Sequence, residues 1–293
     1  MVVDHLISAA IALLFFLYGA RLSRDAVLEG LTNWRLQLLV ILATYALFPA
    51  LGWMLGPSTR WIGPELYAGL LFLTLLPSTV QSSIAFTSIA RGNVPAALCA
   101  ASASNLIGIV LTPLLVQLLL RVEGTNGFSG GAFRTILLQL FLPFAAGQAL
   151  RPWIAGFVGK HRTVLGYVDR SSILLVVYGA FSEGVVTGIW QRLDLMNLLG
   201  LALVCALLLA LVIVVTTVLS RRLGFSKEDE IVMVFCGSKK SLASGIPMAN
   251  VLFPPGVVGL MVLPLMVFHQ IQLMVCATLA QRYARRPQTP LEL

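Results

Sequence analysis

The stretch FCGSKKSLASGIP, residues 235–247, stands inside a long apolar segment and determines how the chain is understood. It places Lys239 and Lys240 side by side where a membrane protein would have hydrocarbon. A lysine at the centre of a membrane helix costs about 2.5–3.5 kcal/mol on insertion scales. Adjacent helical residues point about 100° apart, so one regular helix would struggle to bury both ammonium groups against one partner. A helix break at Gly237 would relax that constraint and expose main-chain groups to a polar cavity.

The composition is that of a membrane protein. The chain has 293 residues, of which 58% are hydrophobic and 11% are charged, and its mean hydropathy is +0.91. A soluble domain carries about 25% charged residues. Repeated apolar runs of about 20 residues are typical of transmembrane helices. The sequence therefore predicts an all-α polytopic protein whose surroundings are a lipid bilayer.

The net charge of +8 has an explanation that needs no nucleic acid. Basic residues of membrane proteins collect in cytoplasmic loops and set the orientation of the chain. The four cysteines stand singly in apolar segments without metal-type spacing, so we interpret them as packing residues. We expect no nucleic-acid partner, no metal site and no cofactor.

Hydropathy along the chain predicts nine spans. Their approximate ranges are 6–20, 36–56, 66–90, 94–120, 132–150, 171–190, 195–219, 231–253 and 257–281.

Charge predicts the orientation of these spans. Of the twenty Lys and Arg residues, fourteen lie on one side and two are Lys239 and Lys240 within a span. The other four, on the opposite side, are Arg60, Arg121, Arg134 and Arg192. The positive-inside rule then puts the N-terminus outside and the C-terminus in the cytoplasm, as in a bacterial inner (plasma) membrane.

The same topology contains an inverted repeat. Residues 1–120 hold four spans that start outside, residues 121–160 hold a linking span, and residues 161–293 hold four spans that start inside. The third span of each group is interrupted, at Pro77 and at Gly237. Interrupted spans at matching places in inverted halves indicate the midplane binding site of a transporter.

Polar residues gather around both breaks, and each has two interpretations. Lys239 and Lys240 either hydrogen-bond to free carbonyls of the other broken span, or at least one of them is a fixed cation in a polar cavity that contacts an anionic substrate or titrates during transport. Glu183, the one carboxylate well inside a span, either pairs with these lysines or reaches the outer interface. His269 is either a packing residue or a proton carrier. The serines, threonines and amides either join helices or line a cavity. The cavity candidates are Gln81, Ser82, Ser83, Thr87, Ser104, Asn105, Glu183, Ser238, Lys239, Lys240, Ser241, His269 and Gln270.

These motifs resemble the bile acid:sodium symporter family, in particular its divergent branch found in bacteria and, as one member, in vertebrates. The resemblance covers essentially the whole chain. It is carried by residues 75–93 (LLP…SS…ARGN), 104–115 (SNLIGIVLTPLL), 235–247 and 263–273 (LPLMVFHQIQL). It implies a core and a panel subdomain built from two inverted five-helix repeats, with two broken helices that cross. The first of the ten helices has no counterpart here, which leaves nine.

The sodium ligands that the resemblance implies are largely replaced. Sodium-dependent relatives carry a Ser–Asn pair after the first break, hydroxyls in the next helix, and a Glu and a Gln around the second break. The matching positions hold Ser83 and Ile84, Ala97 and Ala101, and Phe235 and Lys239. A fixed ammonium can take over a cation's electrostatic role. We therefore expect sodium-independent or proton-coupled transport, with Ser83 and Asn105 the residues near which a sodium ion could still be held.

The leading hypothesis is a secondary transporter of a small organic anion, not an enzyme. One alternative is a non-transporting membrane regulator of the same fold. A remote alternative is an intramembrane hydrolase with Ser238 or Ser241 as nucleophile and a lysine as base. The oligomeric state and the substrate are not predicted.

Overall fold

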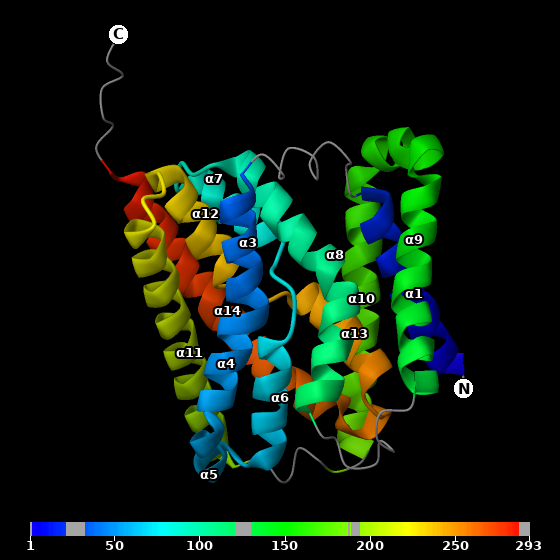
Figure 1. Cartoon of the computed structure of the whole chain (residues 1–293). Coiled ribbons are helices and arrows are strands. Elements are labelled where there is room, and N and C mark those ends of the chain that lie inside the picture. Colours follow the sequence, from blue (N-terminus) through cyan, green and yellow to red (C-terminus); the bar gives the residue numbers. More distant parts are fainter. Residues whose placement is uncertain (1, 22–32, 121–129, 187, 189–193, 287–293) are drawn as a thin grey trace.

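The computed structural model describes residues 2–21, 33–120, 130–186, 188 and 194–286, and all their regular structure is helical (Figure 1). The α-helices are α1 (Val2–Arg21), α3 (Trp34–Leu42), α4 (Phe48–Met54), α5 (Thr59–Ile62), α6 (Pro64–Thr74), α7 (Gln81–Ile89), α8 (Val94–Leu119), α9 (Gly130–Lys160), α10 (Arg162–Val186), α11 (Leu195–Arg222), α12 (Lys227–Gly237), α13 (Leu242–Leu252) and α14 (Pro255–Ala284). A π-helical turn, η1 (Ala43–Leu47), joins α3 to α4, and a 3₁₀ turn, η2 (Gly56–Ser58), precedes α5.

Two spans are interrupted at the places that the sequence indicates. Pro77 lies between α6 and α7, and Gly237 is the last residue of α12, before α13. Proline lacks an N–H and cannot continue a helical hydrogen-bond ladder. Each half-helix has 9 to 11 residues, which is too short to cross a bilayer alone.

Among the described residues, four helical segments are long and apolar enough to cross a membrane. They are Trp34–Met54, Val94–Leu119, Leu195–Arg222 and Pro255–Ala284, and His5–Arg21 is a shorter apolar helix. The predicted number of nine spans is therefore not reached by length and composition alone. The two broken spans fall short because their halves are separate helices.

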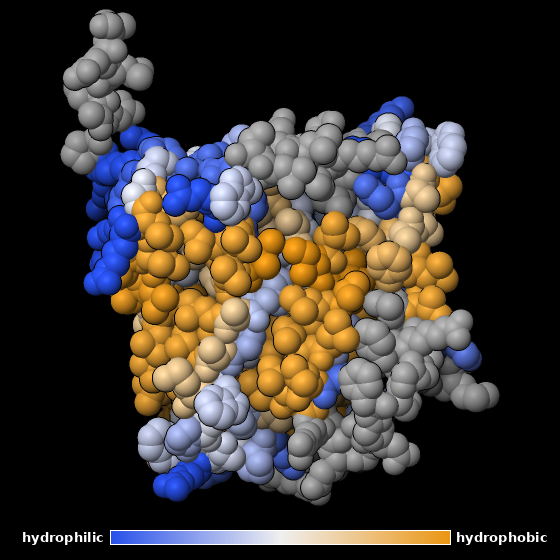
Figure 2. All heavy atoms as spheres, in the orientation of Figure 1, coloured by the Kyte–Doolittle hydropathy of each residue, from blue (hydrophilic) through white to orange (hydrophobic). Residues whose placement is uncertain are grey.

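The surface has the banding of a membrane protein. Figure 2 shows a broad hydrophobic belt between two more hydrophilic ends. Trp34 and Trp53 stand near opposite ends of the Trp34–Met54 segment, and their side chains are 62% and 72% exposed. Exposed tryptophans at both ends of a span are typical of the two membrane–water interfaces. The chain is an integral membrane protein.

Helices α1, α9 and α10 form one side of the molecule, and α3, α4, α6, α11 and α14 lie on the other (Figure 1). The α1 and α9 backbones approach closely because a glycine stands on each. A Cβ on Gly19 would collide with the Phe144 carbonyl, and one on Gly147 with the Phe16 carbonyl. Small residues that let backbones touch are a usual means of packing helices in membranes.

Candidate functional site

The two breaks contact each other directly. The Ser241 N–H donates to the Pro77 carbonyl at 2.9 Å. The Ser78 hydroxyl donates to the Cys236 carbonyl at 2.6 Å. All of these groups lie at or next to the ends of the half-helices, where main-chain groups have no partner within the helix. The interrupted segments thus supply hydrogen bonds to each other, which is how non-helical backbone is tolerated at membrane depth.

Lys240 is enclosed by main-chain oxygens. Its side chain is 0% exposed, and its Nζ lies 2.7 Å from each of the carbonyl oxygens of Thr44, Thr74 and Leu76. An ammonium has three N–H donors, so all three are used. The ring of Phe48 lies 4.2 Å from the same nitrogen. This arrangement matches the first interpretation of the lysine pair, in which an ammonium bonds to free carbonyls and joins the broken spans.

Lys239 has a different environment although it is the neighbouring residue. Its side chain is also 0% exposed, but its Nζ donates only a long hydrogen bond of 3.4 Å to the Ser82 hydroxyl. The nitrogen lies 4.4 Å from the ring centre of Phe86 and 5.6 Å from that of Phe235. Within the described part of the chain, no carboxylate forms an ion pair with it. A charge buried without a partner is costly, so this nitrogen is suited to receiving an anion.

Sequence reasoning missed Gln272 and selected Gln270 in its place. Gln272 is 0% exposed; its Oε1 accepts the Lys240 N–H at 2.9 Å, and its Nε2 donates to the Lys240 carbonyl at 3.0 Å. The same Nε2 lies 2.8 Å from Nδ1 of His269. Gln270 is exposed and points away from the break. The three-residue spacing from His269 to Gln272, one helical turn, was the available signal.

Amide and hydroxyl groups of α8 and α13 complete the crossing. Asn105 donates to the Ser78 carbonyl at 2.7 Å, and its Oδ1 accepts from the Ser244 hydroxyl at 2.8 Å. The Ser78 N–H donates to the Ser104 hydroxyl at 3.0 Å. Asn105 therefore contacts both breaks and Ser104 the first, and Ser244 is a further contributor that sequence reasoning did not name.

The residues that follow the first break divide between two environments. The buried hydroxyl of Ser83 donates to the Phe235 carbonyl at 2.9 Å, and Ser82 contacts Lys239. Thr87 is buried and its Oγ1 has no hydrogen-bond partner among the described residues. Gln81 is exposed. Glu183 lies in α10, and its side chain is outside those described.

Among the described side chains, no carboxylate bonds to Ser83 or Asn105, the residues near which a sodium ion was expected. Ser83 bonds to a carbonyl of α12, whereas Asn105 bonds to Ser78 and Ser244. In the described portion, no group of three or more His, Cys, Asp and Glu side chains is placed to hold a metal ion. The ammonium of Lys239 also stands next to Ser82, one residue from Ser83.

The hydrolase alternative does not fit the serine geometry. The Ser238 hydroxyl donates to the Val234 carbonyl, and the Ser241 hydroxyl donates to that of Ser244 at 3.1 Å. Neither serine is bonded to a lysine, because Lys240 is directed at carbonyls. A nucleophile must lie within hydrogen-bond reach of its base, and here it does not.

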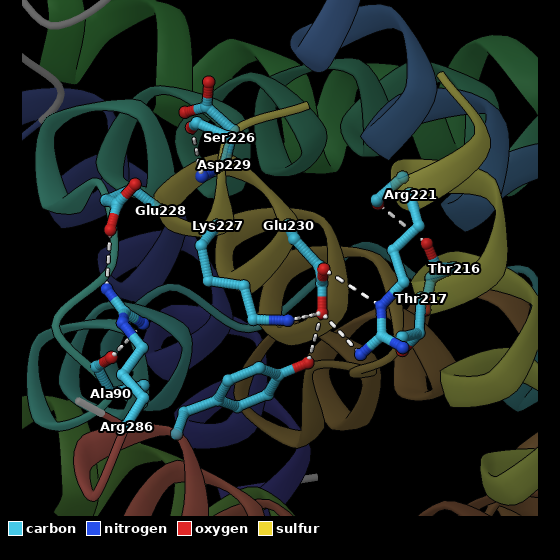
Figure 3. Close-up of polar contacts among 12 residues, drawn as sticks. Ala90, Thr216, Thr217, Arg221, Ser226, Lys227, Glu228, Asp229, Glu230 and Arg286 are labelled. Atoms are coloured by element: carbon cyan, nitrogen blue, oxygen red, sulfur yellow. Dashed lines mark hydrogen bonds and ion pairs between the residues drawn. The ribbon is translucent and has the colours of Figure 1, made fainter. Parts of the chain in front are cut away.

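A second polar cluster, which we call the α12 N-terminal cluster, consists of Lys227, Glu228, Asp229 and Glu230 and their partners (Figure 3). Glu230 is 3% exposed and accepts hydrogen bonds from Arg221, Lys227 and Tyr283. Burial raises the pKa of Glu230, but these donors outweigh it and leave the pKa below its usual value. Glu230 directly precedes the predicted span 231–253.

The other two carboxylates of the cluster reach different elements. Glu228 pairs with Arg286 at 2.6 Å, and Arg286 also donates to the Ala90 carbonyl at the end of α7. Asp229 accepts from Asn93, the N-cap of α8, at 2.9 Å. Three successive acids therefore join α12 to α7, α8, α11 and α14 at one end of the molecule.

Comparisons with known proteins agree with this architecture. The chain matches the SBF-like CPA transporter family over residues 1–285. It is 61% identical over 287 residues to "Uncharacterized protein PA2026" of Pseudomonas aeruginosa, covering 98% of this chain and 86% of that protein. It is 55% identical over 289 residues to "Putative symporter YfeH" of Escherichia coli K12, covering 97% and 86%. It is 27% identical over 275 residues to mouse "Sodium/bile acid cotransporter 7", covering 92% and 80%.

Proposed function

This chain belongs to the SBF-like CPA transporter family, and from that premise we propose that it is a secondary transporter of an organic anion. The family consists of membrane transporters, so the chain is not an enzyme. The resemblance in sequence to the bile acid:sodium symporters is confirmed at this level. The anionic substrate and the mechanism are our proposal.

The observation that carries the proposal is the environment of Lys239. Its ammonium is buried at the meeting point of two broken helices, and its one hydrogen bond to another described residue is the long one to Ser82. A carboxylate, sulfate or phosphate group on a substrate would supply the missing counter-charge. The rings of Phe86 and Phe235 beside the nitrogen suit an organic rather than an inorganic anion. Buried cations inside membranes are functional sites by default.

Alternating access would use the two groups of helices seen in the fold. In this proposal α1, α9 and α10 form the panel, and the crossing helices belong to the core that moves against it. The inverted repeats would be residues 1–120 and 161–293, in a chain of nine spans with the N-terminus outside and the C-terminus in the cytoplasm of a bacterial inner membrane. The four-to-fourteen distribution of basic residues supports this orientation.

Coupling would not depend on the sodium sites of the symporters. Where those proteins have a neutral amide, this chain has Lys239, and where they have a carboxylate it has Phe235. A proton is the coupling ion that fits a site with a lysine and His269 nearby. Transport in potassium buffer would then equal transport in sodium buffer and respond to a pH gradient.

The test is uptake by proteoliposomes from a panel of labelled organic carboxylates, sulfates and phosphates. The variant Lys239→Met should lose at least about tenfold of the uptake rate, because removing a buried charge that pairs with the anion costs about 2 kcal/mol or more. Lys239→Arg should retain part of it. Lys160→Met, at an exposed lysine outside the crossing, is the matched control and should transport normally. Equal uptake by Lys239→Met and wild type would refute the proposal.

A further inference from the structure

We infer that the Lys240 ammonium takes the place of a free metal cation. It occupies a cage that main-chain carbonyls form. Although this deepens the proposed sodium-independent transport and in that sense rests on it, the evidence is a separate part of the structure. The cage consists of the carbonyl oxygens of Thr44, Thr74 and Leu76, each 2.7 Å from Nζ.

Two prolines explain why the first two of these oxygens are free. In the π-helical turn η1, the Phe48 N–H bonds to the Ala43 carbonyl. The next residue, Pro49, has no N–H to offer the Thr44 carbonyl. Thus a proline in α4 leaves one main-chain acceptor inside the bundle without a helical donor.

The Thr74 carbonyl is released in the same way at the end of α6. The residue three positions on is Pro77, which has no N–H. The residue four positions on is Ser78, whose N–H is used by the Ser104 hydroxyl. Buried carbonyls left unpaired would cost about 1–3 kcal/mol each, so the fold needs a donor at this point.

The surroundings favour a charged donor. Thr74 ends α6, and a helix C-terminus carries partial negative charge that a cation stabilises. The ring centre of Phe48 lies 4.2 Å and that of Tyr45 5.8 Å from Nζ, both in cation–π range. A protonated lysine amine has three N–H donors, one for each of the three carbonyls. A ring of carbonyls around a small cation is also the means by which proteins bind sodium or potassium.

The two adjacent lysines therefore have separate tasks. Lys240 joins the breaks through its three carbonyl contacts, and Lys239 remains for the substrate. Because the Lys240 ammonium is tethered, the crossing is assembled without a metal ion. The folded protein should then be equally stable in sodium, potassium and choline salts.

The experiment is thermal unfolding of the purified protein in detergent, in each of these three salts. Wild type should show one melting temperature throughout. Lys240→Ala should melt several degrees lower and recover part of the loss with propylammonium or sodium, which can enter the emptied cage, and not with choline, which is too large. Lys239→Ala is the matched control, with a smaller loss and no recovery by either cation. Lys240→Arg keeps a cation and should melt closer to wild type than Lys240→Ala.

Two results would overturn the inference: a wild type stabilised by sodium over potassium, or a Lys240→Ala protein that no cation restores. If Lys240→Ala does not fold, the wild-type salt series and Lys240→Arg still decide. Neither arm measures transport, so the cage can fail while anion uptake through Lys239 stands, and the reverse.

Discussion

Lys239 and Lys240 are identical neighbours, yet their contacts give them different roles. Lys240 bonds to three carbonyls, and Lys239 to one hydroxyl at 3.4 Å. The residue type alone therefore does not distinguish the two positions, since both carry a basic side chain. The direction of each side chain follows from the non-helical stretch Ser238–Ser241, in which the 100° rule of a helix does not apply.

The Gln272 side chain bonds to the main chain of Lys240, and removing it should lower the stability of the protein. Gln272→Leu would leave both the N–H and the carbonyl of Lys240 without their side-chain partners. The expected cost is about 1–3 kcal/mol for each group left unpaired in the interior. Thermal unfolding of purified protein measures it. Gln270→Leu is the control, because Gln270 lies in the same helix but is exposed, and this variant should unfold as wild type does. Equal losses of stability in the two variants would contradict the role given to Gln272.

The residue scale also shows what sequence could not supply. Lys239, Lys240, Ser104 and Asn105 were chosen because polar groups in an apolar segment need partners. The sequence prediction named Gln270, which is exposed, and did not name the buried Gln272; the packing of α14 against α6, α10 and α11 sets which face of the helix is buried. Its apolar residues surround the helix, so no single stripe marks the buried face.

At the scale of elements, prolines and caps account for the two interruptions. Pro77 follows the end of α6 at Thr74. The Ser241 hydroxyl caps α13 by accepting from the Ser244 N–H at 3.1 Å. Both signals are legible in sequence, because proline lacks a donor and serine is a preferred N-cap. The π-turn at Ala43–Leu47 is less legible. Its defining feature is the hydrogen bond from the Phe48 N–H to the Ala43 carbonyl, directly before Pro49.

The start of α12 carries a prediction on pH. Since the folded-state pKa of Glu230 is below its usual value of about 4.3, its contacts stabilise the protein above that pH. The contribution is lost as pH falls through the folded-state pKa. Melting temperature measured from pH 7 down to 4 and below should fall more steeply for wild type than for Glu230→Gln, which is already destabilised at pH 7.

The control for this prediction is Glu228→Gln. Glu228 pairs with Arg286, but its side chain is 52% exposed, so the pair contributes little. Its melting curve should follow that of wild type across the range. If Glu230→Gln were as stable as wild type at pH 7, the bonds from Arg221, Lys227 and Tyr283 would not have the importance given to them here.

At the scale of the whole molecule, hydropathy was sufficient for the class and insufficient for the count. The four segments that meet the length and hydropathy of a span include Leu195–Arg222 and Pro255–Ala284, close to their predicted ranges. The broken spans were predicted as units of 25 and 23 residues, but their halves are helices of 9 to 11. Which helices lie together, such as α1 with α9, depends on close approaches at Gly19 and Gly147 that no periodicity reveals.

In the whole molecule, we expect water and substrate to reach the Lys239 position during transport and not the Lys240 position. The most direct measurement is thiol labelling in proteoliposomes. The background lacks the four native cysteines, all of which are buried and free: Cys99, Cys205, Cys236 and Cys276. Into it are placed Lys239→Cys and, as control, Lys240→Cys. With a small charged thiol reagent, we predict labelling at 239, slowed by a transported anion, and none at 240. Labelling at both positions, or at neither, would contradict the account.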